Sequence, residues 1–104
     1  MAVKPVPDGS HTVTPSLMVK CAARLIEFLK EAFRGEEAFS MPLPSGEIQH
    51  AEVKIGDAVV MLHPAMHQPP TTTSLFLSVH DADAVYRRAL KAGAISVAEP
   101  MDRF

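Results

Sequence analysis

The segment Glu47–His63 alternates apolar and polar residues on both sides of Gly56-Asp57, a pattern that predicts a β-hairpin with a two-residue turn. The predicted pairs are Ile55 with Ala58, Val53 with Val60, Glu52 with Met61, and His50 with His63. Side chains alternate between the faces of a strand, and directly paired residues share a face. One face is therefore entirely apolar and contains Ala51, Val53, Ile55, Ala58, Val60 and Leu62. The other face either contacts water or lines a site, since it mixes polar and apolar side chains: His50, Glu52, Lys54, Val59, Met61 and His63.

Two amphipathic helices and four further strands are predicted around this hairpin. The first helix spans residues 21–35, ends at Gly35 and has an apolar stripe of Ala22, Leu25, Ile26, Leu29 and Phe33. The second begins at Asp81, which can cap its first turn, and ends at Gly93; its stripe contains Ala82, Val85, Tyr86, Ala89 and Leu90. Alternating or β-branched runs predict strands at His11–Val19, Glu36–Met41, Thr72–Val79 and Ala94–Glu99.

The predicted elements repeat along the chain. Strand, helix and three strands fill residues 11–63, and strand, helix and strand fill residues 72–99, so that Val19 corresponds to Val79 and Ala22 to Ala82. Two copies of one supersecondary unit usually bury a shared surface. We therefore expect a single α+β domain at residues 1–104, with a first module at about 11–63 and a truncated second module at about 72–104.

Composition and charge narrow the classes of protein. The 104 residues are 47% hydrophobic, with 10 Lys and Arg against 12 Asp and Glu, and no basic stripe favours nucleic acid. No apolar run approaches the ~20 residues that span a bilayer. Cys21 is the only cysteine, so a disulfide framework is not expected and a reducing cytoplasm fits.

Four segments in this order carry a family resemblance: HTVTPSLMV, AARLIEFLKEAF, HAEVKIGDAVVML and LFLSVHDADAVYRRALKAGA. Together they resemble the vicinal oxygen chelate superfamily, and within it the PhnB-like branch of the glyoxalase/bleomycin-resistance/dioxygenase-like proteins. The resemblance covers essentially the whole chain. It implies paired βαβββ modules whose sheets curl around a cavity, with the second module incomplete here. An open sheet edge and an uncovered apolar face would follow, so we expect a homodimer, with or without swapped elements.

The resemblance also implies where a metal would bind. Metal enzymes of the family carry ligands on the first and last strands of each module, and the corresponding positions here are Thr14, Ser74 and Met61. Hydroxyls and a thioether are poor ligands for a divalent ion compared with imidazole or carboxylate. We therefore expect no metal and no other cofactor. The predicted function is small-molecule binding or sequestration; the alternatives are a metal-dependent lyase or dioxygenase, and a non-catalytic oligomerising remnant.

The mixed hairpin face holds most of the candidate site. His50 and Glu52 are the catalytic candidates, because a carboxylate beside an imidazole can hold it as a general base. An atypical metal site and a purely hydrogen-bonding cavity wall are the other interpretations of this group. Phe76 would contact either a ligand or a partner subunit. The full set of predicted ligand-binding residues is Thr14, His50, Glu52, Met61, His63, Ser74 and Phe76.

Overall fold

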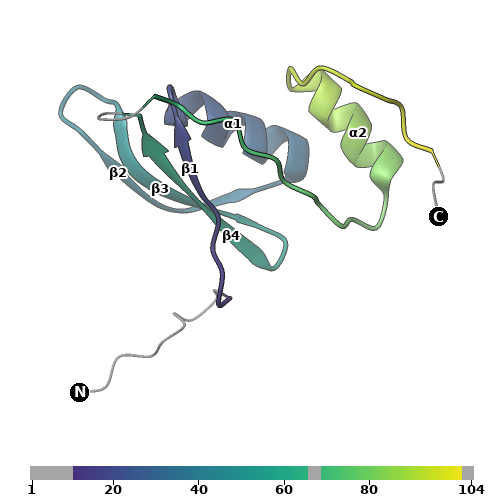
Figure 1. Ribbon diagram of the computed structural model, residues 1–104, viewed down its shortest axis with the longest axis horizontal. Coiled ribbons are helices and arrows are strands. Elements are labelled where there is room, and N and C mark those ends of the chain that lie inside the picture. Colours follow the sequence, from purple (N-terminus) through teal and green to yellow (C-terminus); the bar gives the residue numbers. More distant parts are fainter. Residues whose placement is uncertain (1–10, 66–68, 102–104) are drawn as a thin grey trace.

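A computed structural model describes residues 11–65 and 69–101, and the outer limits of the predicted domain lie outside these ranges. The chain is an α+β protein with one four-stranded mixed sheet and two helices (Figure 1). The elements are β1 (Ser16–Val19), α1 (Ala22–Phe33), β2 (Glu36–Pro42), β3 (Ile48–Ile55), β4 (Ala58–Pro64) and α2 (Ala82–Lys91). The strand order is β1-β4-β3-β2, with β1 parallel to β4 and the other pairs antiparallel.

The predicted hairpin register is confirmed for β3 and β4. Ile55 lies opposite Ala58, Val53 opposite Val60, and Glu52 opposite Met61. Gly56 has a φ of +60°, whereas Asp57 has a negative φ. A glycine with positive φ at the first central position is the arrangement of a type II′ turn, whose twist matches that of the two strands.

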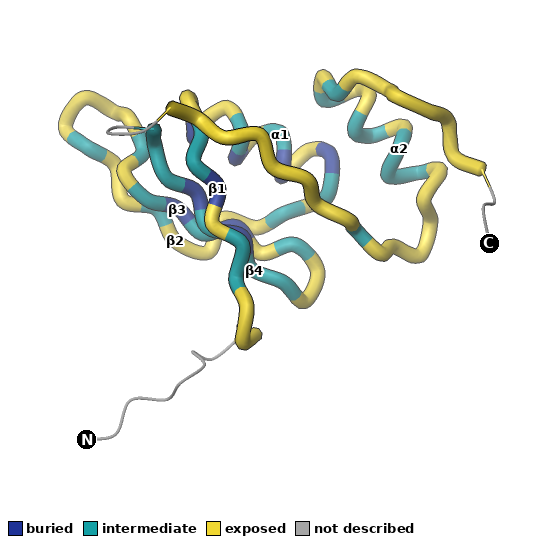
Figure 2. Tube along the Cα trace, viewed as in Figure 1, coloured by how far each residue is buried: buried dark blue, intermediate teal, exposed yellow. Residues whose placement is uncertain are grey.

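The apolar face of the hairpin forms the core beneath α1. Val53 and Leu62 are fully buried, and Ile26 and Leu29 of α1 pack into the same cluster. Burying each such side chain contributes roughly 1.5–3 kcal/mol. The buried stretches, dark blue in Figure 2, fall on α1 and on the strands that it covers. The apolar stripe predicted for the first helix is thus the one that meets the sheet.

The start of α2 agrees with the prediction from sequence, whereas the end of α1 differs from it in one respect. Asp81 caps α2 as predicted, because its Oδ1 accepts a hydrogen bond of 3.0 Å from the Ala84 N–H. At the end of α1, Arg34 rather than Gly35 adopts the left-handed conformation, with a φ of 55°. Gly35 instead lets the backbone approach β3 closely, because a Cβ at this position would lie 2.8 Å from Val53 Cγ1.

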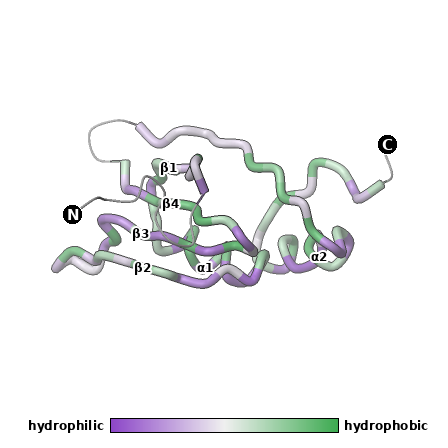
Figure 3. The backbone as a smooth tube through the Cα atoms, turned by 90° about the horizontal axis from the view of Figure 1, so that it is seen from below, coloured by the Kyte–Doolittle hydropathy of each residue, from purple (hydrophilic) through white to green (hydrophobic). Residues whose placement is uncertain are grey.

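The strands predicted at Thr72–Val79 and Ala94–Glu99 are wrong. Neither segment has a strand in the structure, although Thr71 donates a backbone hydrogen bond of 3.2 Å to the Met18 carbonyl at the outer edge of β1. A strand is stable only within a ladder, and the described part of the chain supplies these two segments with no ladder partner. The connection from β4 turns hydrophobic before it enters α2 (Figure 3). Two smaller differences are that β1 begins at Ser16 rather than His11 and that β2 extends to Pro42.

The helix α2 lies beside α1 and is held loosely. Arg88 Nε–H donates a hydrogen bond of 3.2 Å to the Ala32 carbonyl of α1. No residue of α2 is buried, so the apolar stripe predicted for this helix is only half covered. Within the described ranges, no helix has the length and apolar character needed to cross a membrane.

Candidate functional site

The mixed face of the hairpin lies on the side of the sheet opposite α1. Side chains from all four strands share it, because Ser16 and Met18 of β1 lie opposite Met61 and His63. On the other side, Phe39 and Met41 of β2 lie opposite Glu52 and His50. We call this surface the open face and define it as Ser16, Met18, Phe39, Met41, His50, Glu52, Met61 and His63.

An irregularity in β2 decides which of its residues reach the open face. The pairing shifts between Glu37 and Phe39, so that Ala38 is an extra residue. Without this β-bulge, alternation would place Ala38 opposite Glu52 and turn Phe39 toward the other side. The bulge therefore supplies the aromatic ring of the site, and the ring centroids of Phe39 and His50 lie 5.8 Å apart. No turn residue or spacing in the sequence marks such a bulge, so Phe39 and Met41 are not among the site residues predicted from sequence.

Three polar side chains at the centre of the open face form a hydrogen-bonded chain. His50 Nε2 lies 3.2 Å from Glu52 Oε2, and His50 Nδ1 lies 3.3 Å from His63 Nδ1. The His50 side chain is 20% exposed and that of Glu52 is 36% exposed. The two imidazole rings have centroids 4.8 Å apart and are tilted by 44°. The chain is thus half-buried and joins the two strands of the hairpin.

The partners fix the proton positions when both rings are neutral. A carboxylate only accepts hydrogen bonds, so we assign the His50 proton to Nε2, where it faces Glu52. His50 Nδ1 then carries a lone pair and accepts from the Nδ1–H of His63. This leaves a lone pair on His63 Nε2. The group can therefore accept a hydrogen bond from a ligand, and a base held by a carboxylate in this way is suited to proton transfer.

The structure brings together only some of the predicted ligand-binding residues. His50, Glu52, Met61 and His63 share the open face, and Thr14 is half-buried two residues before β1. Next to Thr14, the Pro15 carbonyl accepts a hydrogen bond of 2.9 Å from the Met61 N–H, so Thr14 lies at the edge of this group.

Ser74 and Phe76 lie apart, in the exposed segment between β4 and α2. The Phe76 side chain is 94% exposed and borders a groove of about 920 Å³ together with Ile55, Ala58 and Val60, which belong to the apolar side of the hairpin. The prediction that Phe76 contacts a ligand or a partner subunit assumed a strand at Thr72–Val79, with Phe76 on its polar side. That strand is not formed, and Phe76 borders a groove that His50 does not line.

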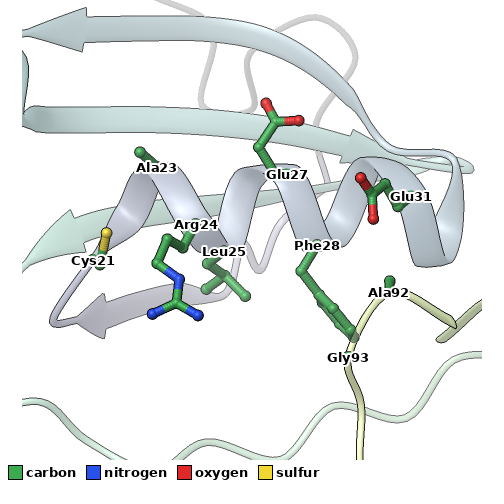
Figure 4. A pocket seen from close by; sticks show the side chains of 9 residues that line it. All are labelled: Cys21, Ala23, Arg24, Leu25, Glu27, Phe28, Glu31, Ala92 and Gly93. Atoms are coloured by element: carbon green, nitrogen blue, oxygen red, sulfur yellow. The ribbon is translucent and has the colours of Figure 1, made fainter. Parts of the chain in front are cut away.

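The open face is not enclosed by the described part of the chain. Besides the groove at Phe76, a second hollow of about 710 Å³ lies on the outer side of α1, where Phe28 points toward Ala92 and Gly93 (Figure 4). Neither hollow is lined by a residue of the open face. A ligand on the open face would therefore rest on a half-exposed surface, or a second layer would have to cover it.

The donors at the positions implied for a family metal do not fit a divalent ion. Thr14 and Ser74 offer hydroxyls and Met61 a thioether, and Ser74 lies in a different segment from the other two. In residues 11–65 and 69–101, no group of three or more His, Cys, Asp and Glu side chains is arranged to hold a metal ion.

Comparisons with known proteins identify related mycobacterial sequences and solved structures with the same fold. No protein-family model matches the sequence. The uncharacterized protein Mb0911c of Mycobacterium bovis is 35% identical, over 82% of this chain and 64% of its own length. The uncharacterized protein Rv0887c of Mycobacterium tuberculosis is also 35% identical, over 82% of this chain and 57% of its own length. The chain thus spans less than two thirds of the length of these relatives.

Two solved structures share the fold. TioX from Micromonospora sp. ML1 superimposes with a TM-score of 0.67 at 24% identity, over 88% of this chain and 79% of that one. The gene product At5g48480 of Arabidopsis thaliana gives a TM-score of 0.67 at 21% identity, over 85% of this chain and 77% of that one. At these identities the similarity establishes the α+β fold alone.

Proposed function

We propose that this chain binds or sequesters a small molecule on the open face, in the manner of the glyoxalase/bleomycin-resistance proteins and without their usual metal site. One observation carries the proposal. The sheet is sealed on one face by α1, whereas its other face keeps a hydrogen-bonded Glu52–His50–His63 chain among Met and Phe side chains. Binding sites for small molecules combine apolar lining with a few fixed polar groups in this way.

The same proposal includes membership of the vicinal oxygen chelate superfamily and its paired βαβββ modules. The order of elements from β1 to β4 supports it, as does the repetition of a helix at Ala82–Lys91 between two strand-like segments. In this scheme Thr72–Val79 and Ala94–Glu99 become strands once they find ladder partners. A cytoplasmic location belongs to the same proposal.

A second copy of the chain is proposed to cover the exposed apolar segments that follow β4. The segments without ladder partners carry large apolar side chains in water, with Phe76 94% exposed, Ile95 91% and Val97 100%. Exposed apolar surface of this kind marks an interaction site in a folded protein. A homodimer would pair these segments with those of a second copy and cover their apolar side chains.

General-base catalysis is the second candidate, and the Glu52–His50 contact favours it. A carboxylate that accepts from one imidazole nitrogen orients the ring and directs the other nitrogen. A metal-dependent lyase or dioxygenase has less support, because the donors at the family positions are hydroxyls and a thioether. The third alternative is a non-catalytic remnant that only oligomerises. It differs from the binding protein and from the enzyme by having no ligand on the open face.

Titration of the ¹⁵N-labelled, metal-free chain with 8-anilinonaphthalene-1-sulfonate tests the binding proposal by NMR. We expect saturable shifts of the His50 and His63 rings and of the Met61 methyl group. Met61→Asp should weaken binding about tenfold, or about 1.4 kcal/mol, because it puts a charge in the apolar part of the face beside Glu52.

Ala23→Asp is the matched control, since it adds the same charge at an exposed position on α1 and should leave the affinity unchanged. Shifts confined to residues 75–81, or equal weakening by both variants, would contradict binding on the open face.

A further inference from the structure

One row of side chains crosses all four strands of the sheet on the open face. It contains Met18 of β1, His63 of β4, His50 of β3 and Met41 of β2. Met18 lies directly opposite His63, and Met41 directly opposite His50. The two imidazoles at the centre are in contact through their Nδ1 atoms. A methionine therefore stands directly opposite each imidazole, on either side of the pair, and its three flexible side-chain bonds allow its sulfur to turn toward the pair.

The spacing of the two imidazole nitrogens is that of a metal chelate. Two nitrogens bound at about 2.0 Å to one tetrahedral ion lie about 3.3 Å from each other. The His50 and His63 Nδ1 atoms are 3.3 Å apart. An ion can therefore take the place of this hydrogen bond with little movement of either side chain, while the His63 proton moves from Nδ1 to the free Nε2 of the same ring.

Glu52 supplies a second, independent feature of a metal site. It lies 3.2 Å from His50 Nε2, the nitrogen that does not face His63. Histidine ligands of metals usually donate their other ring N–H to a carboxylate, which fixes the tautomer and increases the donor strength of the ligating nitrogen. Here that contact directs the Nδ1 lone pair of His50 toward the gap between the rings. The negative charge of Glu52 also favours a cation in that gap.

The ligand atoms available at this site determine which metal ion it favours. In the described ranges no third His, Cys, Asp or Glu completes a metal site, so Zn²⁺, which takes three or four such ligands, is poorly served. Thioether sulfur together with imidazole is a soft set that suits Cu(I). We propose that His50 Nδ1 and His63 Nδ1 bind one cuprous ion on the open face, with the Met18 and Met41 thioethers completing its coordination. This site is distinct from the Thr14, Ser74 and Met61 positions and does not rest on the proposed small-molecule function.

The test is an anaerobic titration of the metal-free chain with Cu(I) in competition with bicinchoninate, whose copper complex is coloured. One ion per chain should be withdrawn from the chelator. His63→Ala should abolish this, and His80→Ala, which removes an exposed imidazole outside the face, should change nothing. X-ray absorption should show nitrogen neighbours at about 2.0 Å and sulfur neighbours at about 2.3 Å.

The Met18→Leu/Met41→Leu double variant separates a cuprous site from a simple imidazole pair. Leucine preserves the volume, so the fold should be kept. We expect at least tenfold weaker Cu(I) binding and unchanged, weak Zn²⁺ binding. The proposal is overturned if the double variant binds Cu(I) as the wild type does, or if His63→Ala still competes with the chelator. Because the naphthalene-sulfonate titration uses metal-free protein, either proposal can fail without the other.

Discussion

Gly35 stands where the end of α1 meets β3, and at the scale of single residues it shows why a glycine is needed. Its sequence context predicts a helix stop, but the left-handed turn is made by Arg34, with a φ of 55°. What requires glycine is space, because a Cβ would lie 2.8 Å from Val53 Cγ1 and 3.2 Å from the Leu29 carbonyl oxygen. Val53 is fully buried and cannot turn away into solvent.

We expect Gly35→Ala to lower the free energy of unfolding by about 1–3 kcal/mol, the usual cost of an added group in a packed core. Urea denaturation measures the change. The Gly35→Ala/Val53→Ala double variant is the control, since it removes the methyl group that the new Cβ meets. The double variant should lose less than the sum of the two single losses. Additive losses would show that the contact with Val53 is not the cause.

At the scale of elements, sequence predicted what depends on near neighbours in the chain. The hairpin register followed from alternation and from Gly56, and the α1 stripe and the Asp81 cap followed from spacing. The contribution of β2 to the site did not follow, because the extra residue Ala38 reverses which side chains face outward beyond it. The strand-like sequence of Thr72–Val79 was also misleading, since a ladder partner is supplied by the rest of the molecule and not by the segment.

The N-terminal cap of α2 leads to a prediction at the scale of elements. The helix buries no residue, and Asp81 satisfies one of its free N–H groups through the 3.0 Å bond to Ala84. Asp81→Ala should cost about 1 kcal/mol, which corresponds to about fivefold faster hydrogen exchange of the α2 amides. The β3 and β4 amides should keep their exchange rates. Asp83→Ala removes the same charge from the first turn without removing the cap bond, and should have a smaller effect. Equal acceleration in α2 and in the sheet would contradict local opening.

At the scale of the whole molecule, the described residues divide into a part with a core and a part without one. Within the described residues, every buried core residue belongs to the part from β1 to β4, and the part after it exposes Phe76, Ile95 and Val97. Apolar strand-like segments outside a ladder offer backbone N–H and C=O groups for pairing as well as exposed side chains. The same segments on a second copy offer a matching surface about a two-fold axis, which is how most homodimers form.

We therefore expect light scattering after size exclusion to give about twice the 11.3 kDa mass of one chain. Ile95→Asp/Val97→Asp should raise the dimer dissociation constant at least tenfold, because it places two charges in the paired surface of each copy. Val13→Asp is the matched control, as it changes an 80% exposed apolar residue ahead of β1, outside these segments. A mass of one chain at every concentration would exclude the second copy as the cover. The 8-anilinonaphthalene-1-sulfonate titration would then give the same affinity for the double variant as for the wild type.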